Sequence, residues 1–163
     1  MDVQTFNALS EAEAQRLVRP CLDVPRWIDD VVQGRPYASL GELLTRAEQS
    51  GDQLSTSEVH QALAHHPRIG ERAEGETKEA TLSRSEQADL GIDADIQAQL
   101  DQGNADYEAR FDQVFLIRAA GRSSQEILAE LRRRLENSDE QEMAETAEQL
   151  KQIAQLRLEG LFS

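Results

Sequence analysis

Cysteine is almost absent from this chain, and aromatic residues are few. The 163 residues include one cysteine, Cys21, and aromatic side chains make up 4% of the sequence. A single cysteine cannot close an intramolecular disulfide, so the fold does not require an oxidising compartment, and we expect a cytoplasmic location. Residues 1–5 lack a basic region followed by an apolar run, so we expect no secretory signal.

Positive charge and long apolar runs are also scarce. Lys and Arg number 17 against 31 Asp and Glu, which gives a formal net charge of −14. This charge repels phosphate backbones and anionic lipid surfaces, so we expect neither nucleic acid nor a membrane among the partners. No apolar run approaches the roughly 18 residues of a transmembrane helix. A small anionic ligand would need positive charge placed locally in its pocket.

Helix signals occur along almost the whole sequence. Starts are predicted where Ser precedes Glu by three residues, or where Pro opens a segment, at Ser10, Pro25, Ser39, Ser55, Ser83 and Ser123 or Ser124. Longer helices are expected at about 93–110 and 138–160. The apolar run 111–120 alone has β character, and no alternating strand pattern occurs. We predict one all-α domain over residues 1–163, a compact orthogonal bundle of about seven to nine helices.

Two polar side chains are predicted on apolar helix faces. Residues i, i+3, i+4 and i+7 share one face of a helix, and His66 follows Val59 by seven residues. On the final helix, Arg157 is central to the stripe formed by Met143, Ala147, Leu150, Ala154 and Leu161. A core histidine bonded to a carbonyl, and an arginine in an internal salt bridge, explain these positions as well as a functional site does.

A third feature is the run from Ser83 to Gln87. Ser83, Glu86 and Gln87 share a face where a helix is expected to begin, although Ser-x-x-Glu is also the ordinary capping box. The three histidines, at positions 60, 65 and 66, do not share a face, and no second ligand cluster accompanies them. We therefore expect no metal site.

Together these residues resemble a known enzyme family. The segments His66-Pro67-Arg68-Ile69-Gly70, Ser83-x-x-Glu86-Gln87, Gly121-Arg122-Ser123 and Arg157-Leu158 are similar to those of the 2-oxo-4-hydroxy-4-carboxy-5-ureidoimidazoline (OHCU) decarboxylases. The resemblance extends from Phe6 to about Leu158. It implies an all-helical fold and decarboxylation, without a cofactor, of the last intermediate between urate and (S)-allantoin.

The resemblance also implies site residues. His66 and Glu86 would be the catalytic pair. The substrate pocket would be lined by Pro67, Ser83, Gln87 and Arg157, and by backbone groups of Phe111, Phe115, Leu116, Ile117 and Ala119. The family usually has Phe-Gly before the apolar run, whereas this chain has Phe111-Asp112-Gln113.

Two other classes of function remain open from the sequence. A helical interaction module without chemistry would show the same acidic surface, and a hydrolase of a neighbouring purine-catabolic intermediate could use the same scaffold. Release of CO2 separates a decarboxylase from a hydrolase. Apolar positions such as Trp27 and Phe162 are expected to be exposed, where they could serve a homodimer, and residues 71–80 are candidates for a lid over the pocket.

Overall fold

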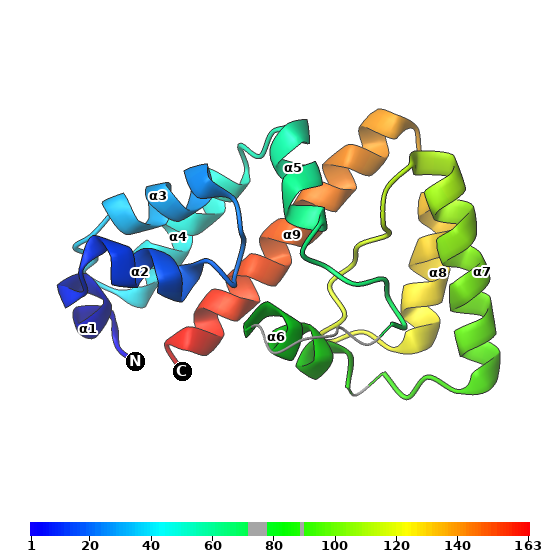
Figure 1. Cartoon of the computed structure of the whole chain (residues 1–163), viewed down its shortest axis with the longest axis horizontal. Helices are drawn as coiled ribbons and strands as arrows, with labels where there is room; N and C mark the ends of the chain where they lie inside the picture. Colours follow the sequence, from blue (N-terminus) through cyan, green and yellow to red (C-terminus); the bar gives the residue numbers. More distant parts are fainter. Residues whose placement is uncertain (72–77, 89) are drawn as a thin grey trace. The chain divides into compact units, whose positions relative to one another are not determined.

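Nine helices and no strand make up the described part of the chain, so the prediction of an all-helical fold is confirmed. The structure is a computed structural model that describes residues 1–71, 78–88 and 90–163 (Figure 1). The helices are α1 (Val3–Ala8), α2 (Glu11–Val18), α3 (Pro25–Gln33), α4 (Leu40–Gly51), α5 (Thr56–Leu63), α6 (Lys78–Gln87), α7 (Ala94–Phe111), α8 (Ser124–Arg134) and α9 (Asp139–Leu161). Within these ranges, none of the helices combines the length and the apolar composition needed to span a bilayer.

Local signals explain most helix starts. The side chains of Ser10 and Ser123 each accept a hydrogen bond from the backbone N–H of a Glu three residues later, whose carboxylate bonds back to the cap residue. Ser55 and Glu58 form the same reciprocal pair. These pairs satisfy backbone groups that a helix leaves unbonded at its N-terminus. The predicted start at Ser83 is wrong, because the described part of α6 already begins at Lys78.

The chain divides into two compact units. The first unit comprises Met1–Ala62 and Leu150–Ser163, and the second comprises Leu63–Gln149. Helix α9 therefore contributes residues 139–149 to the second unit and 150–161 to the first. A single domain over residues 1–163 stays a prediction.

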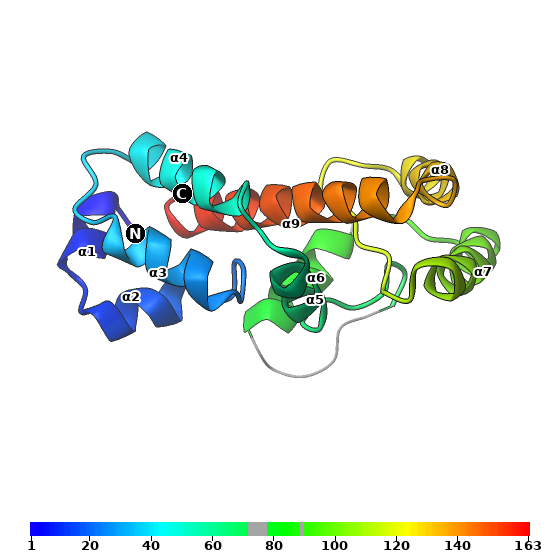
Figure 2. The same cartoon turned by 90° about the horizontal axis from the view of Figure 1, so that it is seen from above.

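Helices α3 and α4 lie side by side in the first unit (Figures 1 and 2). The indole N–H of Trp27 on α3 donates to the carbonyl of Ala47 on α4 at 3.1 Å. Trp27 is 1% exposed, so its predicted exposure at a dimer surface is wrong. The apolar face of α3 buries this ring. Phe162 packs edge to face on Phe6, with ring centroids 5.6 Å apart.

The second unit is built on the pair α7 and α8, which also lie side by side in both views (Figures 1 and 2). Its core joins Leu100 and Tyr107 of α7 to Ile127 and Leu131 of α8. Side chains from the irregular segment between these helices complete the core, namely Phe115, Ile117 and Ala119. The apolar run with β character therefore fills a helical core without forming a strand.

Candidate active site

His66 lies on the turn that follows α5, not on the helix itself. Helix α5 ends at Leu63, and the His66 N–H donates to the Leu63 carbonyl at 3.1 Å. The prediction that placed His66 on the helical stripe of Val59 is thus wrong in its geometry. Pro67 disfavours the α conformation at the residue before it, so the helix ends early. His66 and Pro67 are both half-buried.

Helix α6 carries three of the predicted site residues within its length. Ser83 is 3% exposed and lies well inside the helix, so it does not cap the N-terminus, and the capping-box interpretation is wrong. Glu79, Ser83 and Glu86 are spaced i, i+4 and i+7, so they share one face of α6. Glu86 and Gln87 are half-buried. A buried hydroxyl and two acidic side chains on one helix face form a polar stripe.

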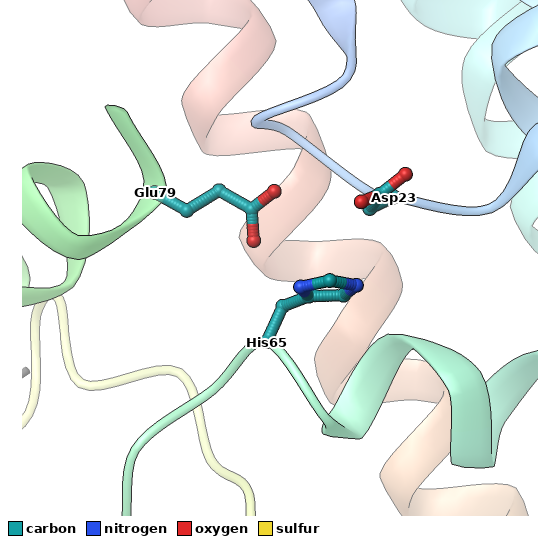
Figure 3. Close-up of side chains that lie close together, drawn as sticks. All are labelled: Asp23, His65 and Glu79. Carbon is teal, nitrogen blue, oxygen red and sulfur yellow. The ribbon is translucent and has the colours of Figure 1, made fainter. Parts of the chain in front are cut away.

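Two contacts join α6 to the segment 65–70. Near the start of the described helix, a ring nitrogen of His65 and a carboxylate oxygen of Glu79 lie within 4.8 Å of one another (Figure 3). At the far end, the Gly70 N–H donates to Oε1 of Gln87 at 3.1 Å. The segment 65–70 therefore runs along α6. His66 and Pro67 lie between the two contacts on the segment, and Ser83 and Glu86 lie between them on the helix.

Helix α7 holds the same segment from another side. The side-chain amide of Asn104, which is 4% exposed, donates to the carbonyl of Ile69 at 3.0 Å. Nη2 of Arg68 donates to Glu108 at 2.9 Å. Gly70 has a φ of +87°, a conformation that glycine adopts without strain. The segment that carries His66 is thus fixed by two helices of the second unit.

Gln87 has a structural contact as well as a predicted substrate contact. Its Oε1 accepts from Gly70, which leaves the amide Nε2 as its donor group. Gln87 also borders a pocket of about 580 Å³ together with Thr81, Arg84 and Ser85, which lie on the face of α6 opposite to Ser83 and Glu86. The predicted catalytic residues do not line that pocket. Gln87 lies at the boundary between the pocket-lining face of α6 and the face that carries Ser83 and Glu86.

His65 and Glu79 also bear on the prediction that there is no metal site. They offer one nitrogen and one carboxylate, whereas protein zinc sites use three or four protein ligands. Asp23, the third side chain drawn in Figure 3, belongs to the first unit. Within the described residues of either unit taken by itself, no three such side chains gather. A site without metal stays a prediction.

The segment 113–119 is largely buried, but only part of its backbone is hydrogen-bonded within the chain. Phe115, Leu116, Ile117 and Ala119 are all buried, and three of them have their side chains in the core. The Leu116 carbonyl accepts from Arg134, and the Arg118 N–H donates to Gln149. In the part of the chain that the structure describes, the N–H groups of Leu116, Ile117 and Ala119 have no hydrogen-bond partner. Phe111, at the end of α7, packs on Tyr107.

Asp112 explains how the chain departs from the Phe-Gly pair. It ends α7 in the left-handed conformation, with φ 54° and ψ 38°, and its N–H donates to the Glu108 carbonyl at 2.8 Å. Glycine adopts this conformation most readily, and aspartate is among the residues that tolerate it. Phe111-Asp112 thus ends α7 in a conformation that glycine in place of Asp112 would adopt without strain.

Arg157 lies in the first unit and is buried, as the sequence predicted. It is 6% exposed, and its Nη1 donates to the Pro20 carbonyl at 2.9 Å. The predicted stripe is only partly correct. Met143 and Ala147 are half-buried, whereas Glu142 and Thr146 are the fully buried residues in the first half of α9. A meeting of Arg157 with His66 and Glu86 of the second unit stays a prediction.

Comparisons with known proteins bear on the activity. The model of a family described as OHCU decarboxylase matches residues 7–159. The chain is 31% identical to the 2-oxo-4-hydroxy-4-carboxy-5-ureidoimidazoline decarboxylase of Amia calva, over 99% of this chain and 95% of that protein. It is 26% identical to the uric acid degradation bifunctional protein of Bacillus sp. (strain TB-90), over 99% of this chain. The match covers 32% of that longer relative.

The fold is also similar to a solved structure. The crystal structure of OHCU decarboxylase in the presence of (S)-allantoin matches with a TM-score of 0.70 and 24% identity. The match covers 88% of this chain and 95% of that one. At this level of identity, the likeness shows a shared fold.

Proposed function

Because the chain belongs to the OHCU decarboxylase family, we propose that it converts 2-oxo-4-hydroxy-4-carboxy-5-ureidoimidazoline to (S)-allantoin and CO2 without a cofactor. One structural observation carries the assignment of the site. The segment with His66 lies along the face of α6 with Ser83 and Glu86: at one end His65 comes within 4.8 Å of Glu79, and at the other Gly70 donates a hydrogen bond to Gln87. The family match also crosses both units, which supports a single enzyme domain over residues 1–163.

The substrate itself can accept the electrons that decarboxylation releases. Its carboxyl-bearing carbon also carries a hydroxyl group and adjoins a C=N bond. When the bond to the carboxylate breaks, its electron pair forms a C=C bond, and the imine electrons move to the ring nitrogen, which takes up a proton. The product of this step is an enol. The chain then has to move protons, orient the substrate and place charge.

We assign the proton transfers to His66 in this proposal. Its imidazole accepts the hydroxyl proton as the enol becomes the amide carbonyl of the ring, and it delivers a proton to the neighbouring carbon. Delivery from one side of the ring gives one enantiomer of allantoin. An imidazole suits both steps because its two nitrogens exchange protons near neutral pH. His66 is half-buried, and its neighbour His65 has a ring nitrogen within 4.8 Å of a carboxylate oxygen of Glu79 on α6, which supports this role.

The other site residues bind and orient the substrate. Glu86 fixes the imidazole or accepts hydrogen bonds from the ureido nitrogens, and Ser83 and the free amide donor of Gln87 add further bonds on the same side. Pro67 shapes the pocket next to His66. The backbone N–H groups between Phe111 and Ala119 donate to substrate oxygens, and Arg157 binds an anionic oxygen. The burial of Arg157 and the unpartnered N–H groups of the segment 113–119 support these contacts.

The two rival functions make different predictions. An interaction module would not accelerate any step, and a hydrolase would consume water and release no CO2. Family membership supports the decarboxylase over both. The direct measurement is to generate the unstable intermediate from urate in situ and to follow CO2 release and optically active allantoin against the spontaneous racemic decay.

Two substitutions test the assignment of the site. We expect His66→Gln and Glu86→Ala each to lower turnover by about 100-fold or more, because acid–base help contributes roughly 10²–10⁴-fold. His60→Gln is the matched control, since His60 is exposed on α5. The far-ultraviolet circular dichroism of all three variants should match that of the parent. Near-parent turnover in His66→Gln or Glu86→Ala would remove that residue from the mechanism.

A cytoplasmic location and a homodimer complete the proposal. The one cysteine, Cys21, is buried in the first unit, so this fold gains nothing from an oxidising compartment. Cell fractionation tests the location. Sedimentation equilibrium of the purified protein tests whether it is a dimer. Trp27 is buried, so it does not contribute to a dimer surface.

A further inference from the structure

A largely buried polar cluster connects helices α7, α8 and α9 to the start of the segment 113–119. It consists of Tyr107 on α7, Gln113, Arg134 on α8, and Glu142 and Thr146 on α9, and all five belong to the second unit. We call it the Arg134 cluster. Arg134 and Glu142 are each 1% exposed. Nε of Arg134 donates to Oε1 of Glu142 at 2.8 Å, its Nη2 donates to the same oxygen, and the Tyr107 hydroxyl donates to it at 2.6 Å.

The cluster contacts the segment 113–119 at Gln113, Phe115 and Leu116. Nη1 of Arg134 donates to the Leu116 carbonyl at 2.7 Å, and its guanidinium lies 4.5 Å from the centre of the Phe115 ring. The amide of Gln113 donates to the Tyr107 hydroxyl at 3.1 Å and to the Thr146 hydroxyl at 3.3 Å. One turn further along α9, Oε1 of Gln149 accepts from the Arg118 N–H at 2.9 Å.

Stability alone is a poor reason for a buried ion pair. Removing two charges from water is costly, and apolar residues of similar volume often replace such a pair with no loss of stability. In this cluster the third donor of Arg134 bonds to a backbone carbonyl of a segment that has no strand partner. The segment has no helical or sheet hydrogen bonds at this point, so the bond from Arg134 sets the direction of the Leu116 carbonyl.

Peptide geometry transmits this direction to Ile117. In a planar trans peptide, the carbonyl of one residue and the N–H of the next point to opposite sides. Because the Leu116 carbonyl points to Arg134, the Ile117 N–H points away from it. Because the Arg118 N–H points to Gln149, the Ile117 carbonyl points away from α9. The directions of the Ile117 N–H and of the Ile117 carbonyl are thus both set by the hydrogen bonds of the neighbouring residues to Arg134 and Gln149.

We propose that Arg134, Glu142 and Tyr107 are positioning residues, which hold the Leu116–Ile117 peptide so that the Ile117 N–H donates to a substrate oxygen. This inference rests on the proposed decarboxylation and on the proposed contact between the segment and the substrate. The residues act through the backbone of the segment and do not touch the substrate. The class of ligand group that this donor takes is an anionic or carbonyl oxygen.

The main test replaces the buried pair by apolar residues in R134M/E142M. The matched control is R133M/E145M, because Arg133 and Glu145 also join α8 to α9 but form an exposed ion pair. We expect R134M/E142M to raise KM several-fold and to lower kcat/KM by about 10- to 100-fold, since misplacement by about 1 Å can cost that much. We expect R133M/E145M to keep the parent values and both variants to keep the parent helical signal.

The split between KM and kcat separates positioning from simple loss of fold. A partly unfolded sample contains fewer active molecules, which lowers kcat and leaves KM unchanged. A displaced donor raises KM in every molecule. Arg134→Lys gives an independent measurement if the double variant does not fold. It keeps the charge beside Glu142, but one ammonium cannot replace the planar fork that reaches both Glu142 and the Leu116 carbonyl, so KM should still rise.

The outcomes distinguish this inference from the proposed function. If the parent does not accelerate formation of (S)-allantoin, the proposed function is wrong, and this inference is wrong with it. If the parent is active and Arg134→Lys or R134M/E142M binds substrate with the parent KM, only the positioning role is overturned. An equal rise of KM in the control R133M/E145M would also overturn it, because the effect would then belong to any link between α8 and α9.

Discussion

The residue Asp112 sets the direction in which the chain leaves α7 for the segment 113–119. Its φ of 54° is a conformation that costs most L-residues roughly 1–2 kcal/mol and that glycine adopts freely. We expect Asp112→Gly to raise the free energy of unfolding by up to about 1 kcal/mol and Asp112→Val to lower it by about 1–2 kcal/mol. Urea unfolding measures both. A loss of stability in Asp112→Gly would show that the aspartate side chain contributes more than its backbone.

Single residues also show what a sequence can and cannot predict about a site. Periodicity places His66 on the stripe of α5, yet the helix ends at Leu63 and His66 lies on the turn that follows it. Periodicity finds residues on a helix, but it does not find the end of that helix to within a few residues. Glu142 was missed because a charged residue is assumed to be exposed, and only its spacing with Thr146 and Leu150 indicated the buried face.

At the scale of elements, capping chemistry predicted helix starts where an apolar stripe follows the cap. The starts at Ser10 and Ser123 depend on local hydrogen bonds, so the sequence alone is sufficient to locate them. Helix α6 was misplaced for the opposite reason. Its residues are mostly polar, and its Ser83-x-x-Glu86 pattern imitates a cap although it lies inside the helix. Residues 72–77, part of the segment predicted as a candidate lid, lie outside the described residues, whereas 78–80 belong to α6.

The close contact between α7 and α8 depends on a glycine, Gly103, which has no side chain. A Cβ at Gly103 would lie 2.7 Å from Cδ2 of Leu131, which is fully buried. Alanine is about 1 kcal/mol more favourable than glycine inside a helix, so propensity and packing oppose each other here. We expect packing to dominate and Gly103→Ala to lower the free energy of unfolding by about 1–3 kcal/mol, the usual cost of overpacking.

Gly160→Ala is the matched control for that prediction. Gly160 lies on α9, and a Cβ there meets no atom within 4 Å, so propensity acts alone. We expect this variant to gain up to about 1 kcal/mol in urea unfolding, and less if the helix end frays. If Gly103→Ala were as stable as Gly160→Ala, the approach of α7 to α8 would not be limited by Leu131.

For the whole molecule, composition predicted more about partners than about organisation. The net charge of −14 and the scattered apolar residues are compatible with an acidic helical protein that carries its positive charge locally, as Arg157 does. The division into two units was not predicted, because α9 contributes to both and its sequence shows no break at residue 149. A boundary inside one helix leaves no linker of Gly, Pro or polar residues to detect.

The two tyrosines report on whether these units unfold together. Tyr37 lies in the first unit and Tyr107 in the second, and burial raises the pKa of each hydroxyl to about 12. Tyr37 donates to the Val31 carbonyl, and Tyr107 donates to Glu142. The unfolded chain ionises these groups near pH 10, so each contributes stability below pH 10 that is lost as the pH rises toward 12. The loss is on the order of 2 kcal/mol for each tyrosine.

We expect one cooperative alkaline transition if both units form a single domain. Tyrosinate absorbance and helical circular dichroism should then change together between pH 10 and 12 in the parent. Tyr37→Phe and Tyr107→Phe should each reduce the slope of unfolding free energy against pH, because each removes one proton that the folded state holds more tightly than the unfolded chain. Two separate alkaline steps, with each substitution abolishing only one of them, would instead mean that the units unfold independently.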